Sequence, residues 1–451
     1  MHSRRDFVRQ SGLVAVGFLG LQKFAFGQFG LSEKAGYGPL RNDPDGIMNL
    51  PEGFRYKVIS RVGTRMSDGF YLPGAADGMA TFSDGGKTIL VRNHELSPGD
   101  MEQSAFGANG ELLKNLDKAL IYDFGNGEKV GVGGTTNLIF DEETMAVEKE
   151  FLSLVGTYRN CAGGPTPWAS WITCEETSAR ADGTLEKDHG YNFEVAATSK
   201  MRVQKPVPLK AMGRFTHEAI AVDPATHIVY QTEDAGDGMI YRFIPDQPGN
   251  LSQGRLQALM VRAWPSCDTR NWPHLQTKAF PIRKPVGVDW IDLEDIDAPE
   301  SDLRLRGFDR GAARFARGEG AWFGNGELYF ACTNGGKKNN GQIFRYTPDR
   351  RDQPGSGTLE LFIESEDADL LENGDNLTVS PWGDIIVCED KSSTPKVVGV
   401  TPEGELYHFA LNVGYKSEFA GVCFSPSGRT MFVNLQGPGL TLAIQGPWKA
   451  P

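Results

Sequence analysis

An all-β fold of short strands joined by tight turns is what the sequence predicts. Glycine accounts for 55 of the 451 residues, well above the usual ~7% of a soluble protein. Runs of β-branched and aromatic residues alternate with turn clusters of Pro, Gly and Asp, a pattern typical of strands rather than helices. With 23% charged and 39% hydrophobic residues, the chain is neither disordered nor a bundle of membrane helices.

One element recurs six times, and this recurrence defines the architecture further. Each copy has a turn, four or five strand-forming residues and then a polar cluster. The copies are 83–95, 165–176, 223–234, 324–334, 380–390 and 425–436. They predict a six-bladed β-propeller with loop insertions, in which one strand is repeated in each blade around a channel. A β-sandwich also has many short strands, but it does not explain six similar endings.

The N-terminus is interpreted as a twin-arginine signal peptide spanning residues 1–27. It contains S-R-R-D-F-V-R at 3–9, a modest apolar stretch and the small-residue site A-F-G at 25–27. The apolar stretch is too short to be a membrane anchor. We therefore expect the Tat translocase to export the folded protein to the periplasm or the medium, and we expect residues 28–451 to form a single propeller domain.

The formal charge of −12 at pH 7 argues against nucleic acid as a partner, because non-specific binding to nucleic acid needs a basic face. No stretch approaches the ~20 apolar residues of a membrane-spanning helix. The six cysteines do not have the spacing of a small disulfide scaffold, so we expect few or no structural disulfides.

Acidic side chains end most of the recurring elements. If these ends converge on the axis, the carboxylates cannot all stay ionised unless cations neutralise them. Clustered oxygen ligands suit calcium, which binds six to eight of them. A solvated channel mouth without metal is the alternative. The acids are Glu95, Glu175, Glu176, Glu233, Asp234, Glu389 and Asp390.

Cys161 differs from the other cysteines in its surroundings. It lies in R-N-C-A-G-G at 159–164, which we interpret as a Gly-rich loop. A thiolate there is suited to be a soft ligand for iron or zinc or a nucleophile, and a small buried residue is the plain alternative. Cys174, Cys332 and Cys388 lie just before the polar ends, where we expect them to pack between strands.

Two further clusters combine residues of functional type. His217 and Glu218 lie together in G-R-F-T-H-E-A at 213–219, where the histidine is either a metal ligand, a hydrogen-bond partner of one, or a core residue. Arg317 and Glu319 are two residues apart, so on an extended segment they share a face. The forked guanidinium of an arginine matches phosphate oxygens; a surface ion pair is the alternative.

These segments together resemble the PhoX family of calcium-dependent alkaline phosphatases over about residues 38–448. Any one motif is weak, but all of them in order, behind a twin-arginine signal, are specific. The motifs are G-G-T-T-N-L (133–138), N-C-A-G-G…P-W…T-C-E-E (160–176), G-R-F-T-H-E-A…V-D-P…V-Y-Q-T-E-D (213–234), E-G-A-W-F…L-Y-F-A-C-T-N-G-G (319–336), D-N-L-T-V-S-P-W-G…C-E-D (375–390) and F-A-G-V-C-F-S-P-S-G-R-T-M-F-V-N-L-Q (419–436).

The resemblance implies an exported, monomeric, six-bladed enzyme that hydrolyses phosphate monoesters and releases inorganic phosphate. It implies two Fe3+ ions with a bridging oxo group, and Ca2+. Cys161 would bind iron, and the carboxylates of Glu176, Glu233 and Glu319 would bind metal. Arg317 would hold the substrate phosphate, with Asn137 in the G-G-T-T-N loop assisting.

The sequence offers further ligand candidates, and it stays open which acid of each adjacent pair faces the metal. These candidates are Glu95, Glu218, Asp375, Asn376, Glu389 and Asp390. Two other functions remain in view. One is a calcium-dependent lactonase or esterase, which needs no thiolate, and the other is a non-catalytic propeller stabilised by calcium.

Overall fold

The computed structural model describes residues 31–32, 35–351 and 355–450. The predicted signal peptide lies outside these residues. Strands make up nearly all of the regular structure, which confirms the all-β prediction. Besides strands, the described residues contain one short α-helix and a few 3₁₀ turns: α2 (Leu303–Asp309), η1 (Met101–Gln103), η2 (Leu113–Asn115), η3 (Lys118–Leu120), η4 (Gly125–Gly127) and η5 (Lys210–Met212). Among the described residues, no helix is both long enough and apolar enough to cross a bilayer.

The first two sheets are antiparallel meanders. The first has the order β4-β5-β6-β7, and the second β8-β9-β10. Their strands are β4 (Ala76–Asp84), β5 (Lys87–His94), β6 (Gly133–Asp141), β7 (Ala146–Thr157), β8 (Asn160–Pro165), β9 (Ser170–Glu175) and β10 (Asn192–Ala196). Two sequence interpretations change here. The segment around Asn137 and the segment around Cys161 were expected to be loops, and both are strands.

The next sheet has nine strands in the order β11-β12-β13-β14-β15-β19-β18-β17-β16. Two meanders run in opposite directions across it and meet where β15 pairs with both β14 and β19. The strands are β11 (His217–Val222), β12 (Val229–Glu233), β13 (Ile240–Gln247), β14 (Asn250–Val261), β15 (Val286–Asp292), β16 (Gly318–Gly324), β17 (Glu327–Cys332), β18 (Gln342–Pro348) and β19 (Gly357–Glu364).

The last two sheets bring the two ends of the described chain together. Their orders are β1-β2-β23-β22-β21-β20 and β24-β25-β26-β3, so N-terminal strands form the outer part of both. The strands are β1 (Leu40–Arg41), β2 (Met48–Pro51), β3 (Arg55–Arg61), β20 (Gly374–Val379), β21 (Ile385–Glu389), β22 (Lys396–Val400), β23 (Leu406–Asn412), β24 (Phe419–Phe424), β25 (Thr430–Leu435) and β26 (Leu440–Gln445).

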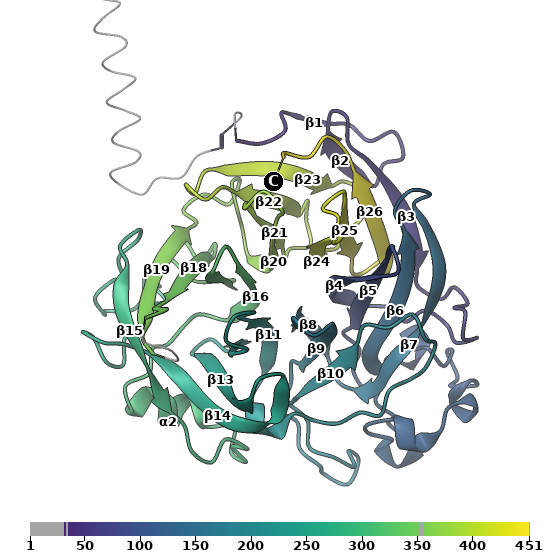
Figure 1. Ribbon diagram of the computed structural model, residues 1–451, viewed down its shortest axis with the longest axis horizontal. Coiled ribbons are helices and arrows are strands. Elements are labelled where there is room, and N and C mark those ends of the chain that lie inside the picture. Colours follow the sequence, from purple (N-terminus) through teal and green to yellow (C-terminus); the bar gives the residue numbers. More distant parts are fainter. Residues whose placement is uncertain (1–30, 33–34, 352–354, 451) are drawn as a thin grey trace, which may run out of the picture.

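The sheets stand around a common centre in a propeller-like arrangement (Figure 1). Around this centre, β4 contacts β8, β8 contacts β11, β11 contacts β16, β16 contacts β20, β20 contacts β24, and β24 returns to β4. The six recurring sequence elements contain the strands that follow these inner strands, namely β5, β9, β12, β17, β21 and β25. The polar ends of the recurring elements therefore lie near one end of the central channel.

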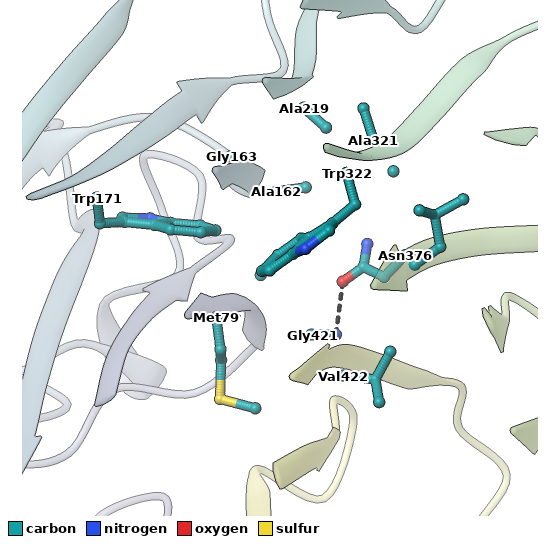
Figure 2. A pocket seen from close by; sticks show the side chains of 13 residues that line it. Met79, Ala162, Gly163, Trp171, Ala219, Ala321, Trp322, Asn376, Gly421 and Val422 are labelled. Atoms are coloured by element: carbon teal, nitrogen blue, oxygen red, sulfur yellow. Dashed lines mark hydrogen bonds between the residues drawn. The ribbon is translucent and has the colours of Figure 1, made fainter. Parts of the chain in front are cut away.

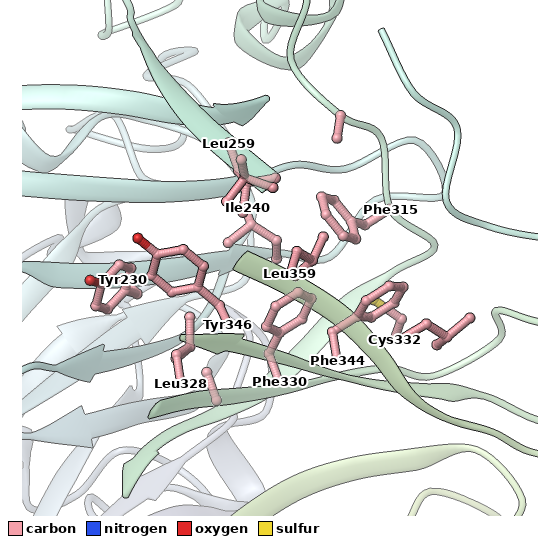
Figure 3. Packing of buried hydrophobic residues seen from close by; sticks show 14 of the residues in the cluster. Tyr230, Ile240, Leu259, Phe315, Leu328, Phe330, Cys332, Phe344, Tyr346 and Leu359 are labelled. Carbon is pink, nitrogen blue, oxygen red and sulfur yellow. The ribbon is translucent and has the colours of Figure 1, made fainter. Parts of the chain in front are cut away.

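The core lies between neighbouring sheets and widens away from the axis. Small residues, including Ala162, Ala219 and Ala321, occupy the inner strands of its largest cluster. Aromatic residues such as Phe330, Phe344 and Tyr346 lie on the strands further out (Figure 3). This gradient of side-chain size suits wedge-shaped gaps between radial sheets. Burying each such aromatic side chain contributes about 1.5–3 kcal/mol.

All six cysteines are buried and unpaired, as the sequence predicts. Cys174 and Cys388 occupy equivalent positions, one residue before the glutamates that pair with Asn160 and Gly374. Cys332 is one residue further along, because it pairs directly with Gly318. The three cysteines therefore do not share one register, although all three pack in the core.

Candidate metal centre

Each of the six innermost strands contains a β-bulge at the same level. The strand register shifts between Ala76 and Met79 in β4, and the other five inner strands shift in the same way. A bulge inserts one extra residue and redirects its side chain. The first inserted residues are Asp77, Cys161, Glu218, Glu319, Asp375 and Gly421. We call the five that carry a functional side chain the bulge ring.

The bulge ring brings metal-ligating atoms together. Ligand atoms of Cys161, Glu176 and Glu218 lie within 4.8 Å of one another, and so do those of Glu218, Glu319 and Asp375. Glu218 belongs to both groups and joins them into one site. The sequence predicts four members of the bulge ring as ligands, namely Cys161, Glu218, Glu319 and Asp375. It also predicts Glu176, and the structure places all five of these predicted residues in the clusters.

Small residues follow the ring residues and let the inner strands approach closely. A Cβ added to Gly78 would lie 2.7 Å from Cα of Ala162, and one added to Gly320 would lie 2.6 Å from the carbonyl oxygen of Asp375. Both distances are well below a normal carbon contact. The backbones of neighbouring inner strands are therefore in direct contact beside the bulge ring.

The channel is nearly closed next to the bulge ring. A cavity of about 20 Å³ remains there, close to the minimum volume that holds one water. The rings of Trp171 and Trp322 extend into this region, and the amide oxygen of Asn376 accepts a hydrogen bond from the backbone N–H of Gly421 (Figure 2). Asn376 thus connects β20 to β24, rather than lying in either ligand cluster.

A second set of acids surrounds the bulge ring. Each of them directly follows the strand that pairs with an inner strand. Their backbone N–H groups donate to the residue that precedes each inner strand: Glu176 to Arg159 (2.9 Å), for example, and Asp234 to Thr216 (3.1 Å). Glu95 and Asp390 make the same contact, to Ala75 and Asn373. Glu95, Glu176, Asp234 and Asp390 are the mouth acids.

The acid immediately before a mouth acid accepts hydrogen bonds from nearby backbone groups instead of facing the channel. Glu175 accepts hydrogen bonds from the backbone N–H groups of Tyr158, Gly190 and Tyr191. Two of the predicted ligands are held in the same way inside their own sheets. The carboxylate of Glu233 accepts from Met239 N (3.1 Å) and Tyr241 Oη (2.7 Å), and that of Glu389 accepts from Glu372 N and Lys396 N.

The structure therefore does not bring Glu233 and Glu389 together with the other predicted ligands. Neither belongs to a ligand cluster in the described residues. Their neighbours Asp234 and Asp390 face the mouth instead, because successive side chains of a strand point to opposite faces.

Two arginines complete the mouth, and both have left-handed backbones, with φ of 49° at Arg317 and 47° at Arg159. Arg317 donates two hydrogen bonds of 2.8 Å to the carboxylate of Asp234, and its Nη2 lies 3.0 Å from Glu319. Arg159 pairs with Glu176 and lies 3.0 Å from Glu95. Both arginines occupy the same position relative to their bulges, which makes Arg159 a site residue that the sequence interpretation missed.

Burial and mutual repulsion raise the pKa values of the carboxyl groups throughout this region. Burial raises the pKa of Glu176 to about 8, against the opposing effect of Arg159. Burial and the nearby Asp390 raise the pKa of Asp375 to about 7 and that of Glu418 to about 10. The pKa values of Asp77, Glu218 and Glu319 are raised for the same reasons. So many buried carboxyl groups destabilise each other as anions unless cations join them.

The thiol of Cys161 is buried among these acids. Its Sγ lies 3.4 Å from the carbonyl oxygen of His217 and 3.5 Å from that of Glu218. Burial and the neighbouring carboxyls raise its pKa. A thiol in an anionic pocket is a poor nucleophile but becomes a thiolate when a metal binds it.

Two other predicted candidates have structural contacts. Asn137 lies in the third strand of the first sheet, opposite Val91, and its amide donates to the carbonyl oxygens of Ala196 and Thr198. The structure does not bring it to the clusters. The ring of His217 stacks on Phe215 at 3.6 Å, and burial lowers its pKa to about 3, so it is a neutral core residue.

Asp77 and Glu418 are the acids that the sequence interpretation missed. A signal for Asp77 does exist: an acid or cysteine followed by a small residue recurs at the inner strands, as in D-G at 77–78, C-A at 161–162, E-A at 218–219 and E-G at 319–320. The polar ends of the recurring elements lie on the strand after each inner strand, so they do not include this second repeat. Glu418 has no such signal, because it precedes β24 in a sheet whose ring position is Gly421.

Comparisons with solved structures find distant likenesses. A gluconolactonase from Xanthomonas campestris is 12% identical, with a TM-score of 0.41 over 91% of this chain and 98% of that chain. A catalytically inactive virginiamycin B lyase from Staphylococcus aureus is 11% identical, with a TM-score of 0.40 over 87% and 99%. A luciferin-regenerating enzyme has a TM-score of 0.43 at 10% identity, over 87% and 96%. At these TM-scores the likenesses carry no argument about this chain.

The comparison with curated protein sequences finds no match. The family model described as alkaline phosphatase PhoX matches residues 35–439. This match contains both ligand clusters, all four mouth acids and both arginines. It covers nearly the whole chain, so the protein belongs to the PhoX family of alkaline phosphatases and is a phosphatase.

Proposed function

We propose that this phosphatase hydrolyses phosphate monoesters at a centre of Fe3+ and Ca2+ held at the mouth of the channel. The observation that carries the proposal is the density of anionic groups there. One thiol, nine carboxyl groups and only two arginines converge on one end of the channel. The carboxyl groups are Asp77, Glu95, Glu176, Glu218, Asp234, Glu319, Asp375, Asp390 and Glu418.

The donor set fits such a centre. Oδ1 of Asp77 is buried and has no hydrogen-bond partner in the described part of the chain, which is the state of an oxygen that lacks its cation. Cys161 with Glu176 and Glu218 would hold iron, because a thiolate is a soft ligand. Glu218, Glu319 and Asp375 would hold the harder calcium ion. Bound cations would neutralise the charge of the phosphoryl group during its transfer.

Arg317 is placed to orient the phosphoryl group. Its two bonds to Asp234 fix the guanidinium, and Nη1 makes no hydrogen bond within the described chain. The side chain is 38% exposed, so a phosphate oxygen can reach it. Arginine at a site of phosphoryl transfer both binds the oxygens and stabilises the charge that develops on them. Arg159 presents a second guanidinium from the equivalent position in the second sheet.

The blade count and the cellular setting belong to the same proposal. Dividing the nine-stranded sheet at β15 gives two four-stranded meanders, β11–β14 and β16–β19, and each begins with a bulged inner strand. This division supports six blades. We further propose that the protein is monomeric and reaches the periplasm or the medium through the twin-arginine pathway. An experimental structure and fractionation of expressing cells test these two points.

The first experiment is metal quantification by mass spectrometry on protein exported in folded form and purified without chelators, followed by a p-nitrophenyl phosphate assay. We expect iron and calcium, each at more than one ion per chain, and release of nitrophenol. Calcium alone, with turnover of lactones and none of phosphoesters, would favour a lactonase-type propeller. Calcium alone with no turnover would favour a purely structural role for the ion.

A further inference from the structure

A pocket of about 270 Å³ lies beside the mouth of the channel. Its walls come from the segments that follow the ends of β5 and β9, and from the segment before β8. The residues that line it are Ser97, Pro98, Lys129, Tyr158, Arg159, Thr177, Ala179, Asp182, Thr184 and Leu185. We call it the rim pocket.

The rim pocket adjoins the proposed metal centre through shared residues. Ser97 follows the mouth acid Glu95 by two positions, and Thr177 directly follows the mouth acid Glu176. Arg159 lines the pocket while its guanidinium binds Glu176 and Glu95. A molecule held at the centre therefore needs to extend only past Arg159 to enter the pocket.

The walls of the rim pocket are held in place by their own hydrogen bonds. Asp182 accepts from the N–H groups of Thr184 (2.8 Å) and Leu185 (2.9 Å). The carbonyl oxygen of Ala179 accepts from His189 N and from the buried guanidinium of Arg214. A preformed pocket loses little entropy when it binds a ligand.

The alcohol half of a substrate has to lie on the open side of the centre. The inward side is lined by Trp171 and Trp322, and the cavity there has a volume of only about 20 Å³. A phosphoryl group among the bulge ring and mouth acids therefore has its ester oxygen directed outward, toward the rim. The rim pocket shares Arg159 with this mouth.

Size and charge indicate which alcohols fit. The volume is just below the ~300–1,000 Å³ typical of pockets for drug-sized ligands, which suits a group of about one sugar ring. Two of its three charged side chains, Lys129 and Arg159, are cationic, in a chain whose formal charge is −12. Lys129 has no ion-pair partner among the described residues, and it lies near Asp182.

We propose that the rim pocket binds the alcohol half of the phosphomonoester and favours polar, sugar-sized alcohols that carry a second anionic group facing Lys129. This inference rests on the proposed function, because it takes the metal centre as the place where the phosphoryl group is bound. It adds what the family membership leaves open, namely which half of the substrate is selected and by which residues.

A charge test uses two substrates of nearly equal size. 3-Phosphoglycerate carries a carboxylate where glycerol 3-phosphate carries a hydroxymethyl group. In the metal-loaded enzyme, Lys129→Gln should lower the ratio of kcat/KM for 3-phosphoglycerate to that for glycerol 3-phosphate roughly three- to fivefold, as expected for one exposed ion pair. Lys200→Gln, at an exposed lysine outside the pocket, is the matched control and should leave this ratio unchanged.

A size test fills the pocket. Ala179→Phe adds a ring on the pocket wall while its backbone hydrogen bonds remain. It should raise KM for glucose 6-phosphate relative to glycerol 3-phosphate roughly tenfold, as steric exclusion from a pocket does. The inhibition constant of inorganic phosphate, which binds only at the centre, reports whether the phosphoryl site is intact.

The outcomes distinguish a failure of the rim-pocket inference from a failure of the proposed function. An active enzyme in which neither variant changes its ratio would overturn the rim-pocket inference and leave the phosphomonoesterase intact. A metal-loaded wild type that hydrolyses none of these monoesters would overturn the proposed function, and this inference with it. If Ala179→Phe lowers the unfolding temperature, Lys129→Gln still tests the inference. Lys129 is exposed, so its substitution should leave the fold intact.

Discussion

The pairs Glu175–Glu176 and Glu233–Asp234 have nearly identical chemistry but opposite surroundings. In each pair the first carboxylate binds backbone N–H groups of its own sheet, and the second faces the channel mouth beside an arginine. The alternation of side chains along an extended chain produces this division. Position in the strand, rather than residue type, thus decides which acid is available to a cation.

Arg317→Ala should lower phosphatase turnover by roughly 10² to 10³, the usual effect of removing one positioned donor to a developing charge. The bound metal content should stay the same, because the ligands of the clusters do not include Arg317. Steady-state kinetics with p-nitrophenyl phosphate and metal quantification on the same sample measure both quantities. Arg306→Ala, which removes an ion pair on α2, is the control. Unchanged turnover would remove Arg317 from the mechanism.

Cys161→Ser should lower the iron content while leaving calcium largely bound. A hydroxyl is nearly the size of a thiol but is a much weaker ligand for iron, and Cys161 is the one sulfur ligand in the two clusters. Cys423→Ala, at a buried cysteine in the core beside Phe432, should retain iron. If the Cys161→Ser protein keeps its full iron content, the thiol is a packing residue.

The sequence predicts the kinds of residue at this centre better than it predicts their directions. Cys161, Glu176, Glu218, Glu319 and Asp375 were selected as ligands from their motifs, and the structure brings their ligand atoms together in the two clusters. Glu233 and Asn137 were selected as well, but Glu233 is bonded within its own sheet and Asn137 donates to Ala196 and Thr198 beside the second sheet. Strand parity depends on where each bulge falls, and a bulge shifts parity by one residue. The type of side chain alone does not reveal that position.

The bulges of the inner strands are the elements that build the centre. Each inserts one residue and so redirects a side chain that a regular strand would direct into the interface between sheets. The recurring turn and strand pattern predicted the sheets, because hydrophobic strands and their turns are local signals. The nine-stranded sheet was not predicted, because the pairing of β15 with β19 joins segments about 70 residues apart.

Gly320→Ala should destabilise the protein without removing any ligand. The new Cβ would lie within 2.8 Å of three backbone atoms of the neighbouring inner strand, and overpacking of this kind typically costs about 1–3 kcal/mol. Gly236→Ala, where the nearest atom lies at 3.7 Å, should change stability by much less. Urea unfolding of both variants with metals bound measures the difference. Equal stabilities would show that the inner strands can move apart.

At the scale of the whole molecule, stability and metal binding should be linked through charge. The carboxyls of Glu176, Asp375 and Glu418 have pKa values raised to about 8, 7 and 10 by burial and by each other. A carboxyl with a raised pKa binds its proton more tightly in the folded state. Its contribution to stability is therefore present at low pH and is lost as pH rises through the folded pKa.

Metal-free protein should accordingly unfold more easily at pH 8 than at pH 6, with the free energy of unfolding lower by on the order of a few kcal/mol. Protein with its cations bound should show a smaller loss, because the cations replace the protons. Thermal unfolding across this pH range, with and without a chelator, measures the effect. Identical pH profiles for the two forms would mean that the carboxyls do not hold cations.

The pairing of β3 with β26 also determines when the centre can exist. β3 lies near the start of the described chain and β26 near its end, so their sheet is incomplete until β26 has been synthesised. The ligands themselves extend from Asp77 to Asp375, with Glu418 beyond them. A nascent chain on the ribosome therefore has only an arc of acids that repel one another. The full ring of acids is therefore assembled only after β26 has paired with β3 and closed the circle of sheets.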